Sequence, residues 1–103
     1  MILYVDIDGT ICTNTDGNYK KATPLTKRIK QMNELYDSGN TITYWTARGS
    51  SQLHNVLRIE QYKRLTKSQL DEWGCRYHFL ELGNKPQFDL FIDDKAKRIE
   101  EIK

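Results

Sequence analysis

The chain opens with ILYVDIDGT at residues 2–10, a stretch in which an apolar run leads directly into two carboxylates. The four apolar residues from Ile2 to Val5 are typical of a buried strand. Asp6 and Asp8 follow at its carboxyl end, where two like charges repel each other and lose hydration unless a cation or a proton lies between them. The stretch therefore indicates a catalytic site. The simpler alternative is that the aspartates cap a turn, because aspartate and glycine are common turn residues.

The composition favours one small intracellular domain. The 103 residues carry 16 basic and 14 acidic side chains, and the net charge of +2 does not by itself indicate a nucleic-acid-binding surface. Cys12 and Cys75 lack metal-ligand spacing and do not suggest a disulfide scaffold, which favours a reducing compartment. No apolar segment approaches the length that crosses a membrane. We expect a single cytoplasmic domain over residues 1–103 with no membrane contact.

The residue pattern predicts alternating strands and helices. After the first strand, β-branched and aromatic residues predict strands at 41–45, 76–80 and 88–92. A polar flap is expected around the turn residues Asp16 and Gly17. Helices are predicted from an N-cap at Thr23 to Gly39, at about 51–57, from a capping box at Thr66 and Gln69 to Gly74, and at 95–102. This order predicts an α/β fold, a three-layer sandwich with a mainly parallel central sheet.

Polar residues cluster where these strands end, which is where parallel sheets bind ligands. The clusters are Asp6 and Asp8, the stretch Thr46 to Arg48, and Asp93 with Asp94, preceded by Lys85 in a loop. Three converging carboxylates are hard oxygen ligands and suit Mg²⁺. Lys85 and the Thr46 hydroxyl would then bind phosphate oxygens, while one carboxylate attacks phosphorus and another protonates the leaving alcohol.

The order of these residues along the chain resembles the four motifs of the haloacid dehalogenase superfamily of phosphatases. The matching residues are Asp6-Ile7-Asp8-Gly9-Thr10, Thr46, Lys85 and Ile92-Asp93-Asp94. The stretches 44–49, 69–78 and 92–96 are also similar to small capless members associated with bacterial capsule and sugar-phosphate biosynthesis. The resemblance implies a Rossmann-like sandwich. It also implies a Mg²⁺-dependent phosphomonoesterase that acts through an aspartyl-phosphate on a small sugar phosphate or a similar metabolite.

The resemblance implies roles for the acidic residues. Asp6 would be the nucleophile and Asp8 the general acid and base. Mg²⁺ would be held by Asp6, the backbone carbonyl of Asp8, and Asp93. Asp94 would orient metal-bound water or Lys85.

The resemblance also implies that Thr46 and Lys85 bind the phosphoryl group. Arg48 is assigned to the substrate as well, with a structural ion pair as the alternative. Superfamily members commonly carry a cap domain, whereas the gaps between motifs here hold a flap and short helices, so we expect an open site with no cap. Either a bulky substrate or a second subunit of a homo-oligomer would then cover it. The lysine usually opens a helix, but Pro86 and Gln87 alone separate Lys85 from the strand beginning at Phe88.

Two other functions remain open at the level of the sequence. Basic helices are compatible with a phosphatase for nucleotides or polynucleotide 3′ ends. A phosphoryl-accepting regulatory domain also combines acidic residues, a threonine and a lysine on a parallel sheet, although its accepting aspartate ends a middle strand, where this chain has Thr46. His54 and His78 are interpreted as packing or surface residues, and Trp45 and Trp73 as core or rim aromatics.

Overall fold

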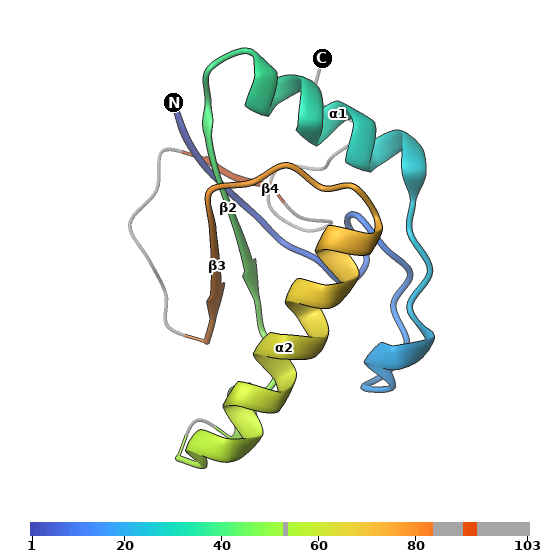
Figure 1. Cartoon of the computed structure of the whole chain (residues 1–103), viewed down its shortest axis with the longest axis vertical. Helices are drawn as coiled ribbons and strands as arrows, with labels where there is room; N and C mark the ends of the chain where they lie inside the picture. Colours follow the sequence, from blue (N-terminus) through green and yellow to red (C-terminus); the bar gives the residue numbers. More distant parts are fainter. Residues whose placement is uncertain (53, 84–89, 93–103) are drawn as a thin grey trace.

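The computed structural model describes residues 1–52, 54–83 and 90–92 (Figure 1). These residues form a sheet of four strands in the order β3-β2-β1-β4, and every neighbouring pair is parallel. The strands are β1 (Ile2–Val5), β2 (Thr41–Thr46), β3 (Phe79–Leu82) and β4 (Leu90–Ile92). The predicted parallel sheet is therefore confirmed, with the first strand at its predicted bounds.

The third strand begins later than predicted. The sequence pattern predicts that the strand begins at residue 76, yet β3 starts at Phe79. Arg76 and Tyr77 are held by the helices instead, because the Arg76 N–H donates to Asn33 Oδ1 at 2.8 Å and the Tyr77 hydroxyl donates to Asp71 Oδ1 at 3.1 Å. Residues 88 and 89 of the predicted fourth strand lie outside the described residues.

Two α-helices connect the strands, α1 (Thr26–Asp37) between β1 and β2 and α2 (Val56–Glu72) between β2 and β3. Right-handed crossovers place both on the same face of a parallel sheet. A hydrogen bond of 2.9 Å from Asn33 Nδ2 on α1 to the Gly74 carbonyl after α2 joins them. The closing helix predicted at 95–102, which would form the third layer, lies outside the described residues.

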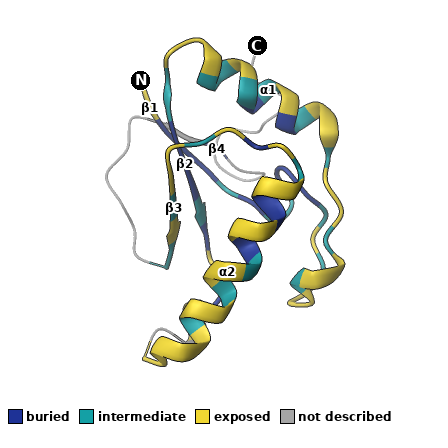
Figure 2. Ribbon diagram, in the orientation of Figure 1, coloured by how far each residue is buried: buried dark blue, intermediate teal, exposed yellow. Residues whose placement is uncertain are grey.

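The core lies between the sheet and these two helices. Ile29 and Met32 of α1 and Leu70 of α2 are buried against the strands, whereas Val56 and Leu57 at the start of α2 are exposed (Figure 2). The fully buried apolar side chains of the sheet and of the turn after β1 are Val5, Ile7, Ile11, Ile42, Tyr44 and Ile92. The second half of α2 is therefore the part that the core holds in place.

The flap after β1 has the predicted turn, but the residues that connect it to α1 fold differently from the prediction. Asp16 and Gly17 both adopt positive φ, at 52° and 94°, as a tight turn requires. The predicted N-cap at Thr23 is wrong. Its carbonyl accepts from the Thr13 N–H at 2.9 Å, so this stretch pairs with the other arm of the flap and α1 begins at Thr26. A short 3₁₀ helix, η1 (Tyr19–Lys21), lies on the returning arm.

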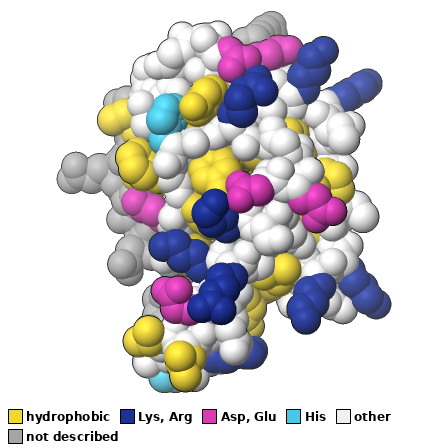
Figure 3. All heavy atoms as spheres, in the orientation of Figure 1, with side chains coloured by type: hydrophobic (Ala, Val, Ile, Leu, Met, Phe, Trp, Pro, Cys, Tyr) yellow, Lys and Arg dark blue, Asp and Glu magenta, His cyan; other side chains and the backbone are white. Residues whose placement is uncertain are grey.

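The region between β2 and β3 folds differently from the prediction. A 3₁₀ helix, η2 (Ser50–Gln52), precedes one continuous α2, so the helix predicted at 51–57 and the N-cap at Thr66 are both wrong. Asn55 caps α2 by accepting from the Arg58 N–H at 3.2 Å. Thr66 is internal to the helix, and its hydroxyl donates to the Tyr62 carbonyl at 2.8 Å. Figure 3 shows Lys and Arg side chains along α2. These basic residues interrupt the apolar periodicity by which a helix is recognised in the sequence.

The intervals between β1 and β2 and between β2 and β3 hold the flap, η1, η2 and the two α-helices. Neither interval contains an inserted domain among the described residues, as predicted. None of the helices in the described part of the chain has both the length and the apolar character needed to cross a membrane.

We expect Leu70→Ala to lower the free energy of unfolding by about 2–5 kcal/mol, because it leaves a cavity in the core against which α2 packs. Leu70 is fully buried, whereas Leu57 in the same helix is 76% exposed. Leu57→Ala is the matched control and should change stability by no more than about 0.5 kcal/mol. Urea unfolding followed by circular dichroism measures both. Equal losses for the two variants would contradict this description of the core.

Candidate active site

Asp6 and Thr46 lie at the carboxyl ends of neighbouring strands. Val5, the last residue of β1, is in register with Tyr44 of β2 and with Ile92 of β4. The Asp6 N–H continues the pairing with β4 by donating to the Ile92 carbonyl at 2.9 Å. Thr46 is the last residue of β2. The structure therefore brings Asp6 and Thr46 to the same edge of the sheet, where ligands of parallel sheets bind.

Asp8 forms an ion pair with Arg48. Arg48 Nε donates to Asp8 Oδ2 at 2.9 Å and Nη2 donates to Oδ1 at 2.8 Å, so the two planar groups bind through two parallel hydrogen bonds. The Arg48 side chain is fully buried and that of Asp8 is 18% exposed. A buried guanidinium needs an anionic partner, because an unpaired charge inside a protein is strongly destabilising. Asp8 supplies that partner and is fixed in orientation by it.

The other nitrogens of Arg48 are also engaged. Nη1 donates to Thr66 Oγ1 at 3.2 Å and to Gln69 Oε1 at 2.6 Å, both on α2. Nη2 also lies 3.9 Å from Cys12 Sγ, and the ring of Tyr19 stacks on the guanidinium with its centroid 4.6 Å from Cζ. We call Asp8, Arg48, Thr66, Gln69 and Tyr19 the arginine cluster. The assignment of Arg48 to phosphate is not supported by this geometry, which shows the ion-pair alternative instead.

The arginine cluster joins the flap to α2. Gln69 accepts from Arg48 with its side-chain oxygen and donates with Nε2 to the Tyr19 carbonyl at 2.7 Å. Sequence reasoning missed Thr66 and Gln69 as members of the site because it assigned them to the start of a helix. The signal that identifies them is their spacing of three residues, which places both on one face of a continuous helix.

Thr46 holds the loop that carries Arg48. Its Oγ1 accepts from the Arg48 backbone N–H at 3.0 Å. Two residues beyond Ala47, Gly49 has φ +76, and a Cβ there would lie 2.8 Å from Tyr62 Cδ2. The loop after β2 is therefore packed tightly against α2, which keeps Arg48 buried.

Arg28 of α1 also contributes to the site. Its Nη1 donates to the carbonyls of Gly9 at 3.2 Å and Thr10 at 3.3 Å, directly after Asp8. Arg28 therefore fixes the backbone of the loop that positions Asp8.

Lys85, Asp93 and Asp94 lie outside the described residues. Within residues 1–52, 54–83 and 90–92, no three His, Cys, Asp or Glu side chains form a group that could hold a metal. The Asp6 carboxylate and the Asp8 backbone carbonyl are hard oxygen donors, which fit Mg²⁺ rather than a soft metal. The sequence places Asp93 directly after Ile92, whose carbonyl accepts from the Asp6 N–H.

Cys12 is unsuited to act as a nucleophile, although its thiol lies 3.6 Å from Asp8 Oδ1. Burial, and to a lesser extent the negative charge of Asp8, raises the pKa of Cys12 to about 12. The reactive form of cysteine is the thiolate, and a thiol with this pKa stays protonated at neutral pH. Burial likewise raises the pKa of Cys75 to about 12.

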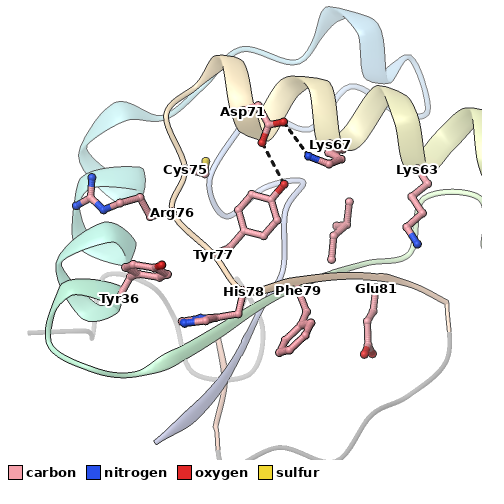
Figure 4. Close-up of a pocket in the computed structure, with 11 residues that line it drawn as sticks. Tyr36, Lys63, Lys67, Asp71, Cys75, Arg76, Tyr77, His78, Phe79 and Glu81 are labelled. Atoms are coloured by element: carbon pink, nitrogen blue, oxygen red, sulfur yellow. Dashed lines mark hydrogen bonds and ion pairs between the residues drawn. The ribbon is translucent and has the colours of Figure 1, made fainter.

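A separate pocket of about 650 Å³ lies between α2 and β3 (Figure 4). Asp71 at its rim accepts from the Tyr77 hydroxyl and from Lys67 Nζ, the latter at 3.0 Å. His78 also lines it and is structural, because its Nδ1 accepts from the Ile42 N–H at 3.1 Å and its ring stacks on Tyr36. None of the residues that line this pocket follows the carboxyl end of β1 or β2, so it is distinct from the candidate active site.

Comparisons with known proteins support the fold. No protein-family model matches the chain, and no curated protein does. A structural-genomics target from Vibrio cholerae has a TM-score of 0.76 and 29% sequence identity, over 98% of this chain and 85% of that one. A D,D-heptose 1,7-bisphosphate phosphatase from B. bronchiseptica, solved with magnesium and phosphate, has a TM-score of 0.55 and 13% identity, over 85% of this chain and 52% of that one. The chain has a small α/β fold of the haloacid dehalogenase-like, Rossmann type, as predicted.

We expect both cysteines of the native protein to resist Ellman's reagent at about pH 8, because thiols with a pKa near 12 carry almost no thiolate there. In denaturant the pKa returns to about 8.5 and both thiols should react. A Cys75→Ser variant leaves Cys12 as the single thiol and assigns its rate. Rapid labelling of that variant in its native state would show that Cys12 is not buried and that the pKa of its thiol is not raised.

Proposed function

We propose that this protein is a Mg²⁺-dependent phosphomonoester hydrolase that forms an aspartyl-phosphate at Asp6. The observation that carries the proposal is the ion pair between Asp8 and the buried Arg48. Asp8 lies two residues after Asp6, which follows the carboxyl end of β1 in a parallel sheet. A turn-capping aspartate does not require a buried guanidinium with partners from two other elements. The phosphatase from B. bronchiseptica, crystallised with magnesium and phosphate, shares the fold and supports the same chemistry.

In the proposed reaction, an Asp6 oxygen attacks phosphorus and the bond from phosphorus to the substrate oxygen breaks. Asp8 gives a proton to that oxygen, so the leaving group departs as an alcohol. Asp8 then removes a proton from water, which attacks phosphorus and releases phosphate together with the free Asp6 carboxylate. Both steps need the two aspartates to lie on opposite sides of the transferred group in a fixed arrangement.

The remaining residues bind the phosphoryl group. The proton of the Thr46 hydroxyl and the cation of Lys85 would contact its oxygens. Asp6, the Asp8 carbonyl and Asp93 would hold Mg²⁺, and Asp94 would orient metal-bound water or Lys85. Mg²⁺, when bound, neutralises negative charge on the phosphoryl oxygens. The substrate is a small sugar phosphate or a similar metabolite, which can reach a site that no cap domain covers.

Arg48 is a positioning residue in this mechanism. It binds each oxygen of Asp8 once, which leaves a second position on each oxygen for the proton that Asp8 gives to the leaving group. Thr66 and Gln69 prevent the guanidinium from turning away, because they hold Nη1. The general acid is thereby pre-oriented before substrate binds, which lowers the cost of reaching the reactive geometry.

We expect Asp6→Asn to lower kcat for p-nitrophenyl phosphate with Mg²⁺ by about a thousandfold or more, since the amide cannot act as the nucleophile. Chelation of Mg²⁺ by EDTA should abolish wild-type activity, and added Mg²⁺ should restore it. Asp37→Asn is the matched control, because Asp37 is an exposed carboxylate at the end of α1. Phosphate release measures all three.

Activity of Asp6→Asn near that of the wild type would rule out covalent catalysis at this residue. A phosphorylated wild-type protein that persists for hours without turnover would instead identify a phosphoryl-accepting regulatory domain. The same assay with nucleotides and 3′-phosphorylated oligonucleotides distinguishes a sugar phosphatase from a polynucleotide phosphatase. The activity of a polynucleotide phosphatase should fall steeply as the salt concentration is raised.

We expect Arg48→Lys to lower kcat by about 10- to 100-fold for an alkyl phosphate, because lysine keeps the charge but loses the two-bonded geometry. The loss should be smaller for p-nitrophenyl phosphate, whose leaving group needs little help from a general acid. Arg76→Lys is the control, because Arg76 makes a similar two-bonded contact to Asp37 on the surface. A merely structural role for Arg48 would lower both activities equally, in step with the folded fraction measured by circular dichroism.

A further inference from the structure

A second hollow lies between the flap and the first half of α2. Its volume is about 490 Å³, and small-molecule sites commonly measure ~300–1,000 Å³. Tyr19 and Lys20 line it from η1, and Arg58, Gln61 and Tyr62 line it from α2. We call it the flap pocket. It is distinct from the pocket at β3, with which it shares no lining residue.

The flap pocket adjoins the arginine cluster through Tyr19. The Tyr19 ring stacks on Arg48, which in turn binds Asp8. Burial raises the pKa of Tyr19, and the negative charge of Asp8 contributes to the same shift, which fits a hydroxyl near that carboxylate. Tyr62 packs edge-on against Tyr19 with ring centroids 5.8 Å apart and also lies against Gly49 in the loop after β2. The pocket is thus two side-chain contacts from Asp8.

The lining of the flap pocket is basic. Lys20 lines it from η1 and Arg58 lines it from α2, and none of its described lining residues is acidic. Figure 3 shows Lys and Arg side chains on both the α2 side and the η1 side of this part of the surface. An anion in the pocket would therefore meet positive charge from two sides and no opposing carboxylate in the lining.

Arg58 is exposed, and two neighbours on its own helix contact its guanidinium. Its Nη1 donates to Gln61 Oε1 at 3.1 Å, its Nη2 donates to the Tyr62 hydroxyl at 3.4 Å, and its Cζ lies 5.4 Å from the centroid of the Tyr62 ring. These contacts leave further guanidinium N–H groups for a ligand. An arginine with a fixed plane binds phosphate and carboxylate oxygens in pairs, and loses less side-chain entropy on binding than a free one.

We propose that the flap pocket receives the leaving group of the substrate and that Lys20 and Arg58 recognise a second anionic group on it. The inference rests on the proposed function, in which the oxygen of the leaving group takes its proton from Asp8 and must therefore depart on the side of the arginine cluster. The tyrosine rings offer flat walls for a sugar ring. The preferred substrates are then sugar phosphates with a second phosphate or a carboxylate, rather than neutral sugar monophosphates.

The test compares kcat/KM for glucose 1,6-bisphosphate, 6-phosphogluconate and glucose 6-phosphate, with p-nitrophenyl phosphate as a substrate that carries no second anion. For the wild type we expect at least one doubly anionic sugar to exceed glucose 6-phosphate by about tenfold or more. The bisphosphate and the phosphogluconate arms separate a phosphate from a carboxylate as the second group.

We expect Arg58→Ala and Lys20→Ala each to lower the ratio of kcat/KM for that sugar to kcat/KM for p-nitrophenyl phosphate by about tenfold, mainly through KM. Lys30→Ala, which removes an exposed lysine from α1, is the control and should keep the ratio. Arg58→Lys keeps one charge and should lose less than Arg58→Ala. Circular dichroism confirms that each variant is folded.

The outcomes separate the two proposals. If the wild type hydrolyses p-nitrophenyl phosphate but shows no preference for a second anionic group, or if the Lys20 and Arg58 variants leave the ratio unchanged, the role of the flap pocket is wrong and the phosphatase proposal stands. If the wild type with Mg²⁺ hydrolyses none of the four esters, the phosphatase proposal itself fails.

Discussion

The buried positive charge of Arg48 is the constraint on which the rest of the site depends. A guanidinium with no exposed surface must be neutralised and must have its N–H groups satisfied, because water cannot do either. Asp8 neutralises it, while Thr66 and Gln69 accept the remaining hydrogen bonds. The loop after β1, the loop after β2 and helix α2 are thereby held in one arrangement. Removing any of these partners would leave a charge or a polar group buried without compensation.

The same interaction explains how the described residues build a defined site although the intervals from β1 to β3 hold no inserted domain in the part of the chain that the structure describes. The flap is short, but Gln69 holds the Tyr19 carbonyl and Arg48 holds the Tyr19 ring, so the flap is fixed to α2 rather than left as an independent lid. Between flap and helix a hollow remains, lined by tyrosines and by cations from both elements. In the proposed function, catalytic orientation and substrate selection would be linked through Tyr19, which stacks on Arg48 and lines the flap pocket.

The helix boundaries show where sequence reasoning failed. The Thr23-Pro24 pair satisfies the rules for a helix start, but residues 11–13 and 23–25 pair with each other and delay α1 to Thr26. Thr66 and Gln69 satisfy the rules for a capping box, yet they lie inside α2, where both side chains accept hydrogen bonds from Arg48. Local rules describe what a residue can do for its own backbone, and in both places a partner distant in sequence determined the outcome.

The sequence by itself determined the parallel α/β fold and the edge of the sheet at which Asp6, Asp8 and Thr46 lie, because an apolar run followed by polar residues specifies a buried strand and its carboxyl end. Only the tertiary structure decided that Arg48 pairs with Asp8, which is one of the two alternatives that the sequence left open. That choice depends on whether the guanidinium is buried and on which acceptors surround it, and those acceptors come from α2, about 20 residues further along the chain. The spacing of residues in a sequence defines faces and ends of elements, but it does not define which faces meet.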